Sequence, residues 1–171
     1  VSEEDVSLKI LELWPDLDSK SVEKMVSASA SLMEKENFGV EVEGYNVEVV
    51  YMDGTRREIS LVKESIDFNF GSNESVSILE SVPREIAESY SDLSIKNSDY
   101  EVLKENTIVS FGSDTKEIVY TLDKKINLDL IKEIDTFALV KIEEEKESER
   151  AISGYFAFVD LSKSKDYLGI I

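Results

Sequence analysis

Apolar residues near the start of the chain recur three or four positions apart, which is the spacing of a helix face. The stretch from Val6 to Trp14 predicts one helix, which ends at Pro15. A second apolar stripe, from Val22 to Met33, predicts another helix that Asp18 or Ser19 caps and that runs to about residue 37. We therefore expect a helical hairpin over residues 1–38.

From residue 40 onward the apolar spacing changes from the helical period to two. Tyr45, Val47, Val49 and Tyr51 alternate with Asn46, Glu48, Val50 and Met52, as in a strand of a sheet. The dipeptide Asp53-Gly54 follows at once, and this pair predicts a two-residue hairpin turn because both residues tolerate positive φ. The returning strand is expected to run through position 61.

The remainder of the chain consists of short β-branched and aromatic runs separated by turn residues, a pattern typical of an antiparallel sandwich. Further strands are expected at residues 66–70, 75–81, 107–111, 117–122, 136–143 and 151–161, and short helices at 83–90 and 127–134. The predicted fold class is α+β, with an N-terminal helical hairpin followed by a mostly antiparallel, β-sandwich-like domain over residues 39–171.

Composition narrows the possible chemistry. The 171 residues include no cysteine and no histidine, so disulfides, thiolate nucleophiles and a Ser-His-Asp triad are excluded within this chain. Any catalysis would fall to carboxylates, lysine or tyrosine, and no pattern of these residues marks a catalytic centre. We expect a protein that is not an enzyme, with no catalytic residue and no cofactor.

The charge is strongly one-sided, with 37 acidic and 19 basic residues and a net charge of −18. Nucleic acid binding is therefore not expected, because the phosphate backbone would be repelled. The charge leaves cations, basic partners or solubility as its uses. There is also no run of eighteen apolar residues, so we expect no direct membrane insertion within this chain and place any anchor outside it.

Two local patterns are candidate sites. Glu143, Glu144, Glu145, Glu147 and Glu149 gather five carboxylates, but they lack the Asp-rich loop with a central glycine that marks calcium loops, so we interpret the run as solvated surface and expect no metal site. The triplet that begins at Asn73 is an N-glycosylation sequon in an expected turn, so Asn73 is a possible glycosylation site.

Three stretches carry a family resemblance: VPREIAES at 82–89, EIVYTLDKKIN at 117–127 and DTFA at 135–138. In this order they resemble a module repeated in exported and membrane-anchored proteins of methanogenic archaea, over about residues 40–143. The resemblance implies an immunoglobulin-like or related β-sandwich outside the membrane that serves adhesion, envelope architecture or protein contact. It supplies no catalytic residues, and the N-terminal helical hairpin has no place in it.

The sequence thus predicts a noncatalytic extracytoplasmic interaction or structural domain of an archaeal-type cell-envelope protein, located at the cell surface, whose partner is a protein or an envelope component. Two alternatives stay open. One is a cytoplasmic acidic adaptor that binds a basic protein partner through complementary charge. The other is a carboxylate-dependent enzyme.

Overall fold

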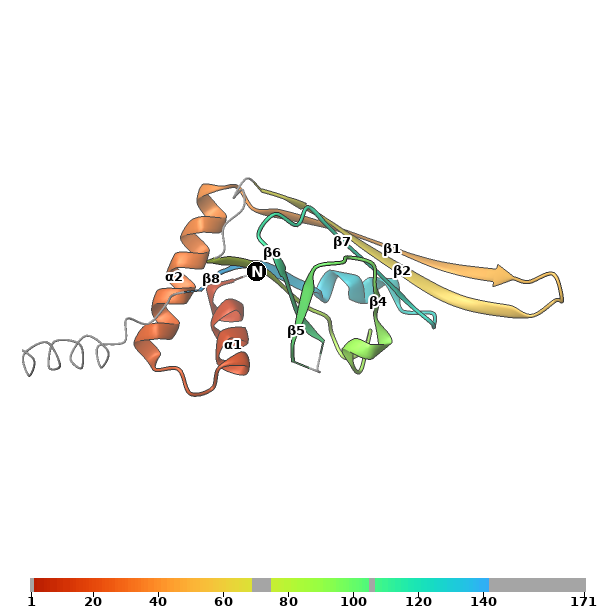
Figure 1. The fold of residues 1–171 in the computed structure, drawn as a ribbon, viewed down its shortest axis with the longest axis horizontal. Helices are drawn as coiled ribbons and strands as arrows, with labels where there is room; N and C mark the ends of the chain where they lie inside the picture. The colour runs from red at the N-terminus through yellow and green to blue at the C-terminus, as the bar shows by residue number, and fades with distance from the viewer. Residues whose placement is uncertain (1, 69–74, 105–106, 142–171) are drawn as a thin grey trace, which may run out of the picture.

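The protein is built in three layers (Figure 1). The computed structural model describes residues 2–68, 75–104 and 107–141. A helical hairpin packs on one four-stranded sheet, in the order β5-β6-β3-β8, and a second four-stranded sheet, in the order β1-β2-β7-β4, packs on its other face. All strand pairs are antiparallel. This confirms the predicted α+β class with an N-terminal helical hairpin and a sandwich-like β region.

The two helices form where the apolar stripes predicted them. Helix α1 spans Glu3–Leu13 and helix α2 spans Ser19–Lys35. Asp18 is the N-cap of α2, since its Oδ1 accepts hydrogen bonds from the backbone N–H groups of Lys20 (2.9 Å) and Ser21 (3.0 Å). The apolar period and the cap therefore specify this part of the fold locally.

The first sheet, which we call the arm sheet, contains two long strands and two short ones. Its members are β1 (Gly39–Val50), β2 (Arg56–Asp67), β7 (Glu117–Leu122) and β4 (Ser94–Ile95). The separate strand expected at 66–70 is wrong for its first two residues, which continue β2 and pair with the start of β1. The physical reason is that the alternation of buried positions runs unbroken through β2, so no turn intervenes.

The hairpin between β1 and β2 differs from the predicted two-residue turn. Tyr51 and Thr55 close a three-residue loop, because Tyr51 N–H donates to the Thr55 carbonyl at 2.9 Å. Gly54 takes a φ of +90°, as expected, but Asp53 does not take a positive φ. Asp53 instead accepts hydrogen bonds from the Thr55 backbone N–H (2.9 Å) and hydroxyl (2.7 Å), so its side chain favours the longer loop.

The second sheet, which we call the central sheet, lies between the arm sheet and the helices. Its strands are β5 (Tyr100–Lys104), β6 (Ile108–Gly112), β3 (Val76–Ser81) and β8 (Asp135–Val140). The helix expected at 83–90 is wrong. A single turn closes on the Pro83 carbonyl there, and the short 3-10 helix η1 (Tyr90–Asp92) follows. The helix expected at 127–134 is the 3-10 helix η2 (Leu128–Glu133).

Strands β6, β3 and β8 of the central sheet are buried on both faces. The inner face of the sheet joins the arm sheet in the main core, and its outer face carries Leu79, Phe137 and Leu139 against the two helices. Trp14, at the end of the apolar stripe of α1, packs against this second cluster and is half-buried. The helical hairpin is therefore held to the sandwich by a shared apolar cluster.

Helix α2 also closes one edge of the central sheet. Backbone N–H groups on the outer edge of β8 need partners, because a buried unpaired donor is costly. The Ser29 hydroxyl accepts from Val140 N–H at 2.9 Å, and Met33 Sδ accepts from Ala138 N–H at 3.4 Å. Side chains of α2 thus replace the strand that β8 lacks.

Replacing Ser29 by alanine tests this arrangement. The Ser29 side chain is fully buried, so Ser29→Ala removes the acceptor of Val140 N–H and leaves that donor unpaired. We expect the free energy of unfolding to fall by about 1–3 kcal/mol. Ser27→Ala, at an exposed position of the same helix, is the matched control and should be neutral or slightly stabilising. Equal urea midpoints for the two variants would contradict the capping role of Ser29.

Candidate functional site

The β1–β2 hairpin extends beyond the rest of the molecule. Strand β7 pairs with β2 only over Ser60–Ser65, so residues 47–59 continue as a ribbon of two strands that we call the arm. The arm projects from the end of the molecule opposite the helices (Figure 1). Each of its strands has 12 residues in all, about twice the usual length of a strand in a globular protein.

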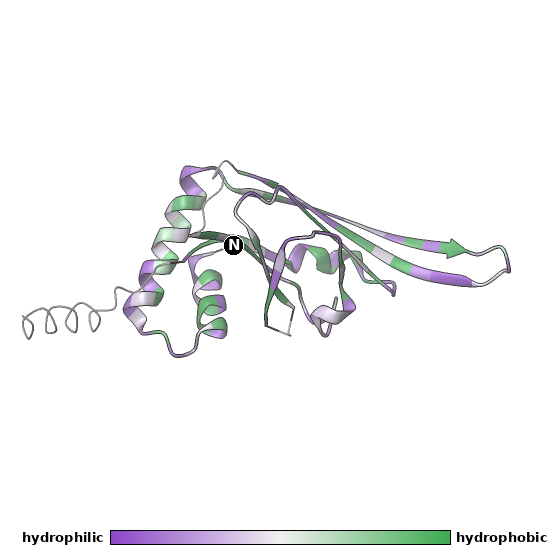
Figure 2. Ribbon diagram, in the orientation of Figure 1, coloured by the Kyte–Doolittle hydropathy of each residue, from purple (hydrophilic) through white to green (hydrophobic). Residues whose placement is uncertain are grey.

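The arm and its base carry most of the exposed apolar surface. Five of the nine large apolar side chains that are exposed in the described part of the chain lie on β1 and its loop, and these are Tyr45, Val47, Val50, Tyr51 and Met52. Met52, at the tip, is completely exposed. Green and purple alternate along the arm (Figure 2), so apolar side chains stand among polar ones with no core to cover them.

The register of β1 and β2 gathers several of these side chains on one face. Tyr45 pairs with Leu61, and Val47 pairs with Ile59, so the four side chains form two adjacent cross-strand pairs. This face points away from the central sheet, because the buried Val62 alternates with Leu61 along β2. The arm sheet therefore exposes an apolar stripe on the side that the helices do not cover.

Ion pairs hold the arm, but they do not make it strongly stable. Arg56 pairs with Glu48, and Arg57 pairs with Asp123 at the end of β7. Glu48 and Glu58 lie directly opposite each other in the register, and like charges in that position destabilise a ribbon. The ion pairs are exposed, so each contributes little.

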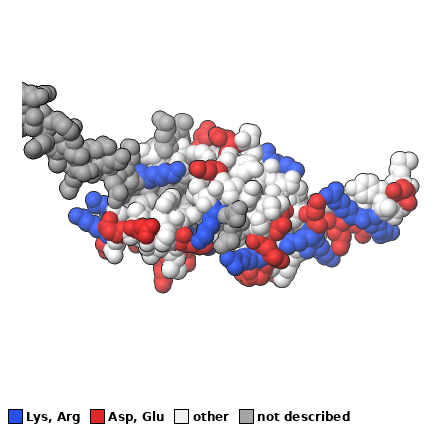
Figure 3. Space-filling view, turned by 60° about the horizontal axis from the view of Figure 1, so that its bottom comes forward, with Lys and Arg blue, Asp and Glu red and all other residues white. Residues whose placement is uncertain are grey.

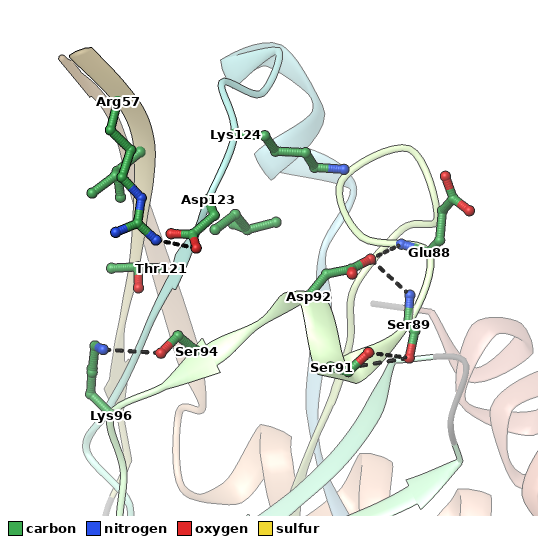
Figure 4. A pocket seen from close by; sticks show the side chains of 12 residues that line it. Arg57, Glu88, Ser89, Ser91, Asp92, Ser94, Lys96, Thr121, Asp123 and Lys124 are labelled. Carbon is green, nitrogen blue, oxygen red and sulfur yellow. Dashed lines mark hydrogen bonds and ion pairs between the residues drawn. The ribbon is translucent and has the colours of Figure 1, made fainter. Parts of the chain in front are cut away.

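A polar hollow of about 980 Å³ opens beside the base of the arm (Figure 4). It lies between β2, β7, β4 and the η1 turn. Three cations line it, namely Arg57, Lys96 and Lys124, together with the carboxylates of Glu88, Asp92 and Asp123 and four hydroxyls. Such a mixture of charges could contact a small polar molecule if its groups were not already paired within the protein.

Most of the hollow's polar groups are engaged by the protein itself. Asp92 Oδ2 accepts from the backbone N–H groups of Glu88 (3.0 Å) and Ser89 (3.2 Å), which fixes the η1 turn. The carboxylate of Asp123 holds Arg57, and Lys96 Nζ donates to Ser94 Oγ at 3.1 Å. Asp92 thus fastens the η1 turn, and Asp123 fastens the base of the arm.

A second polar cluster lies inside the sandwich. Glu64 on β2 and Tyr120 on β7 face Glu80 on β3 and Thr136 on β8, and the two glutamates and the tyrosine have no exposed surface. Thr136 Oγ1 donates to Glu64 Oε2 at 2.6 Å and so joins the two sheets. Within the described residues, Glu64 Oε1, both Glu80 carboxyl oxygens and Tyr120 Oη have no hydrogen bond of good geometry.

Burial and mutual repulsion keep protons in this cluster. Burial is the main cause that raises the pKa of Glu80 well above its usual range, and the charge of Glu64 raises it further. Burial also raises the pKa of Glu64, although the nearby Glu80 carboxyl and the Thr136 hydroxyl partly offset this effect. The fold therefore favours the protonated form of Glu80.

A pair of acids that shares a proton resembles the chemistry of some hydrolases, but its position decides against that use here. A catalytic acid must reach a substrate within hydrogen-bonding distance. Both glutamate side chains are sealed between the two sheets. We therefore interpret the cluster as a polar contact between the sheets whose burial lowers the free energy of unfolding.

The predicted site residues fall outside these three features. Asn73 and the acidic run from Glu143 to Glu149 lie outside the described residues. Among the residues that are described, no three His, Cys, Asp or Glu side chains converge to hold a metal ion. The internal cluster was missed, although a signal existed: Glu64 stands between Val62 and Ile66 on the buried face of the strand.

The buried acids predict an unusual pH dependence. A carboxyl whose pKa is raised on folding binds more protons in the native state, so stability is lost as pH rises from the unfolded value of about 4.5 through the folded pKa. We expect Glu80→Gln to flatten this decline and to be more stable than the parent at its alkaline end by about 1–3 kcal/mol. Denaturant unfolding at a series of pH values measures both quantities.

The control for this prediction is Glu101→Gln, at an exposed position of β5. The Glu101 side chain lies in solvent and outside the internal cluster, so this variant should keep the slope of the parent. A Glu80→Gln slope equal to that of Glu101→Gln would contradict the proton-holding cluster.

Comparison with known proteins adds no relative to this geometry. No known protein family, curated protein or solved structure matches the chain. In the part of the chain that the structure describes, no helix is long and apolar enough to cross a membrane.

Proposed function

We propose that the chain is a noncatalytic interaction or structural domain of an archaeal-type cell-envelope protein, and that the arm is its contact surface. The arm is the observation that carries this proposal. It extends past β7 and exposes apolar side chains at its base, along its length and at its tip. The resemblance of residues 82–89, 117–127 and 135–138 to exported archaeal modules supports the extracytoplasmic location.

The arm has the properties of a contact surface more than those of a stabilising element. A two-stranded ribbon without a third strand or a packed face is marginally stable in water. Apolar side chains that stay exposed on such a ribbon do not stabilise it in water. Their burial against a partner is favourable. We therefore expect Val50, Tyr51 and Met52, which are exposed here, to be buried by a partner in a complex.

The noncatalytic part of the proposal is supported by the way the acids are used. Asp92 and Asp123 hold backbone and arginine groups of the protein, and Glu64 and Glu80 are sealed in the interior. Asp92 and Asp123 are thus paired within the protein, and Glu64 and Glu80 cannot be reached from solvent, so none of the four is available to a substrate. The ion pair of Asp123 with Arg57 beside the hollow holds the base of the arm.

The net charge favours a second candidate, a cytoplasmic adaptor that binds a basic protein. Acidic and basic side chains are interspersed on the face seen in Figure 3, but the whole chain carries −18. Such a charge steers a basic partner toward the protein in either compartment. The two candidates therefore share a contact mode and differ in location.

Site-specific photocrosslinking in the cells that express this chain tests the arm. We expect a photoreactive phenylalanine analogue at Met52, the arm tip, to give a discrete adduct with another macromolecule. The same analogue at Leu8, which is 60% exposed on α1, is the matched control and should give none. Identical adduct patterns from the two positions would refute the arm as the contact surface.

Protease treatment of intact cells tests the location. A domain on the cell surface should be cleaved while a cytoplasmic marker stays whole. Protection of the chain in intact cells, followed by cleavage after lysis, would favour the adaptor.

A further inference from the structure

We propose that the outer edge of β1 binds an extended segment of a partner protein, in which Lys or Arg alternates with apolar residues, as a fifth strand of the arm sheet. This inference rests on the proposed function and names the chemistry of its partner. It is carried by three features that meet along the first half of β1: an open strand edge, a partly apolar groove and the acidic outward face of the strand.

The edge of β1 is the long open edge of the sandwich. Helix α2 closes the edge of β8 through Ser29 and Met33. The outer strand β4 has only two residues, and β5 has a register shift between Val102 and Lys104. β1 has 12 residues in regular register and, within the described residues, no backbone partner on its outer side. Such an edge is a template for strand addition.

A groove of mixed lining runs beside this edge. It has a volume of about 620 Å³. Apolar side chains line it, including Met33, Phe38, Val40, Val42 and Ile134, together with the polar side chains of Glu34, Lys132 and Thr136. Val40 and Val42 belong to the face of β1 that points toward the central sheet, because they pair with Ile66 and the buried Glu64. Side chains on the same face of an added strand would enter the groove, so these positions should be apolar.

The side chains on the opposite face of β1 determine which charge an added strand should carry. Glu41 and Glu43 point outward there, and β1 contains no Lys or Arg. Lys63 lies across from Glu43, but its ammonium is 2.7 Å from Glu117 on the next strand. Outward side chains of an added strand would therefore stand beside two carboxylates, and Lys or Arg suits these positions. With period two, the two faces together require alternation of basic and apolar residues.

A second copy of this chain fits the edge less well. Each copy carries a net charge of −18, so two copies repel each other at long range. The only charged residues that a second β1 brings are glutamates, and Glu48 lies on its inward face. Antiparallel pairing of two β1 edges would place that carboxylate beside the partly apolar groove or the other copy's acids.

The experiment uses the full chain and a capped eight-residue peptide in which lysine and valine alternate. We expect saturable binding by calorimetry and slower hydrogen exchange at alternate backbone amides of β1. A second peptide with the same composition, four lysines followed by four valines, should bind at least about tenfold more weakly, because it cannot place valine in the groove and lysine beside the glutamates together.

Two double variants separate the edge from general charge. Glu41→Lys with Glu43→Lys should weaken the alternating peptide by about tenfold or more. Glu23→Lys with Glu85→Lys makes the same change in net charge at exposed positions elsewhere, and it should weaken binding by less than about threefold. Circular dichroism of both variants checks that the fold is kept.

Four outcomes would overturn the inference. Equal binding of both peptides would mean that charge alone attracts them. No binding together with a dimer in light scattering that Val42→Pro abolishes would assign the edge to a second copy. No binding together with β1 amides that are already protected in the unbound chain would mean that the edge is covered by this chain itself. A crosslink at Met52 without peptide binding would refute strand addition and leave the arm proposal standing.

Discussion

The need to satisfy backbone groups at sheet edges shapes this molecule more than any other single constraint. Two open sheets have four edges, and an unpaired row of N–H and C=O groups invites association with another strand. Three edges are blunted by the fold: α2 side chains cover β8, β4 is very short, and β5 is irregular. The fourth edge, β1, is long and regular. Helix α2 thus supplies partners for the backbone groups at the edge of β8, whereas the backbone groups at the outer edge of β1 are left to solvent or to another strand.

Buried polar groups in the interior are a second constraint, because they limit the stability of the sandwich. A packed core between the sheets would be more stable if it were apolar throughout, yet Glu64, Glu80 and Tyr120 occupy its middle. Thr136 donates a hydrogen bond to one carboxyl oxygen of Glu64, and burial raises the pKa of both glutamates, which favours their uncharged forms. Polar contacts of this kind can set how two sheets are aligned, because apolar surfaces slide over each other more easily than a hydrogen-bonded pair. Stability in this region then depends on pH, which an apolar core would not show.

Local patterns predicted the parts of the fold that local forces determine. The helical stripe and the Asp18 cap placed α1 and α2, and the alternation around Val47 placed the first strand. The helix expected at 83–90 failed because one Pro83-closed turn and the Ser89 cap satisfy the backbone there without a longer helix. β4 and β5 were missed because short edge strands depend on their neighbours and carry little periodicity of their own. The arm was visible as a strand pair, but its exposure follows from where β7 ends, which is a long-range pairing that periodicity does not contain.

The arm and the core differ in a way that indicates what each part of the sequence serves. Core strands place apolar residues where burial stabilises them, with the glutamate pair as the exception. The arm places Glu48 opposite Glu58 and leaves Val50 and Met52 in solvent, choices that weaken an isolated ribbon. Sequences violate local rules of stability mainly where function requires it. A partner that covers the apolar side chains and supplies positive charge would compensate both features together, and this is the chemistry that the edge of β1 also requires.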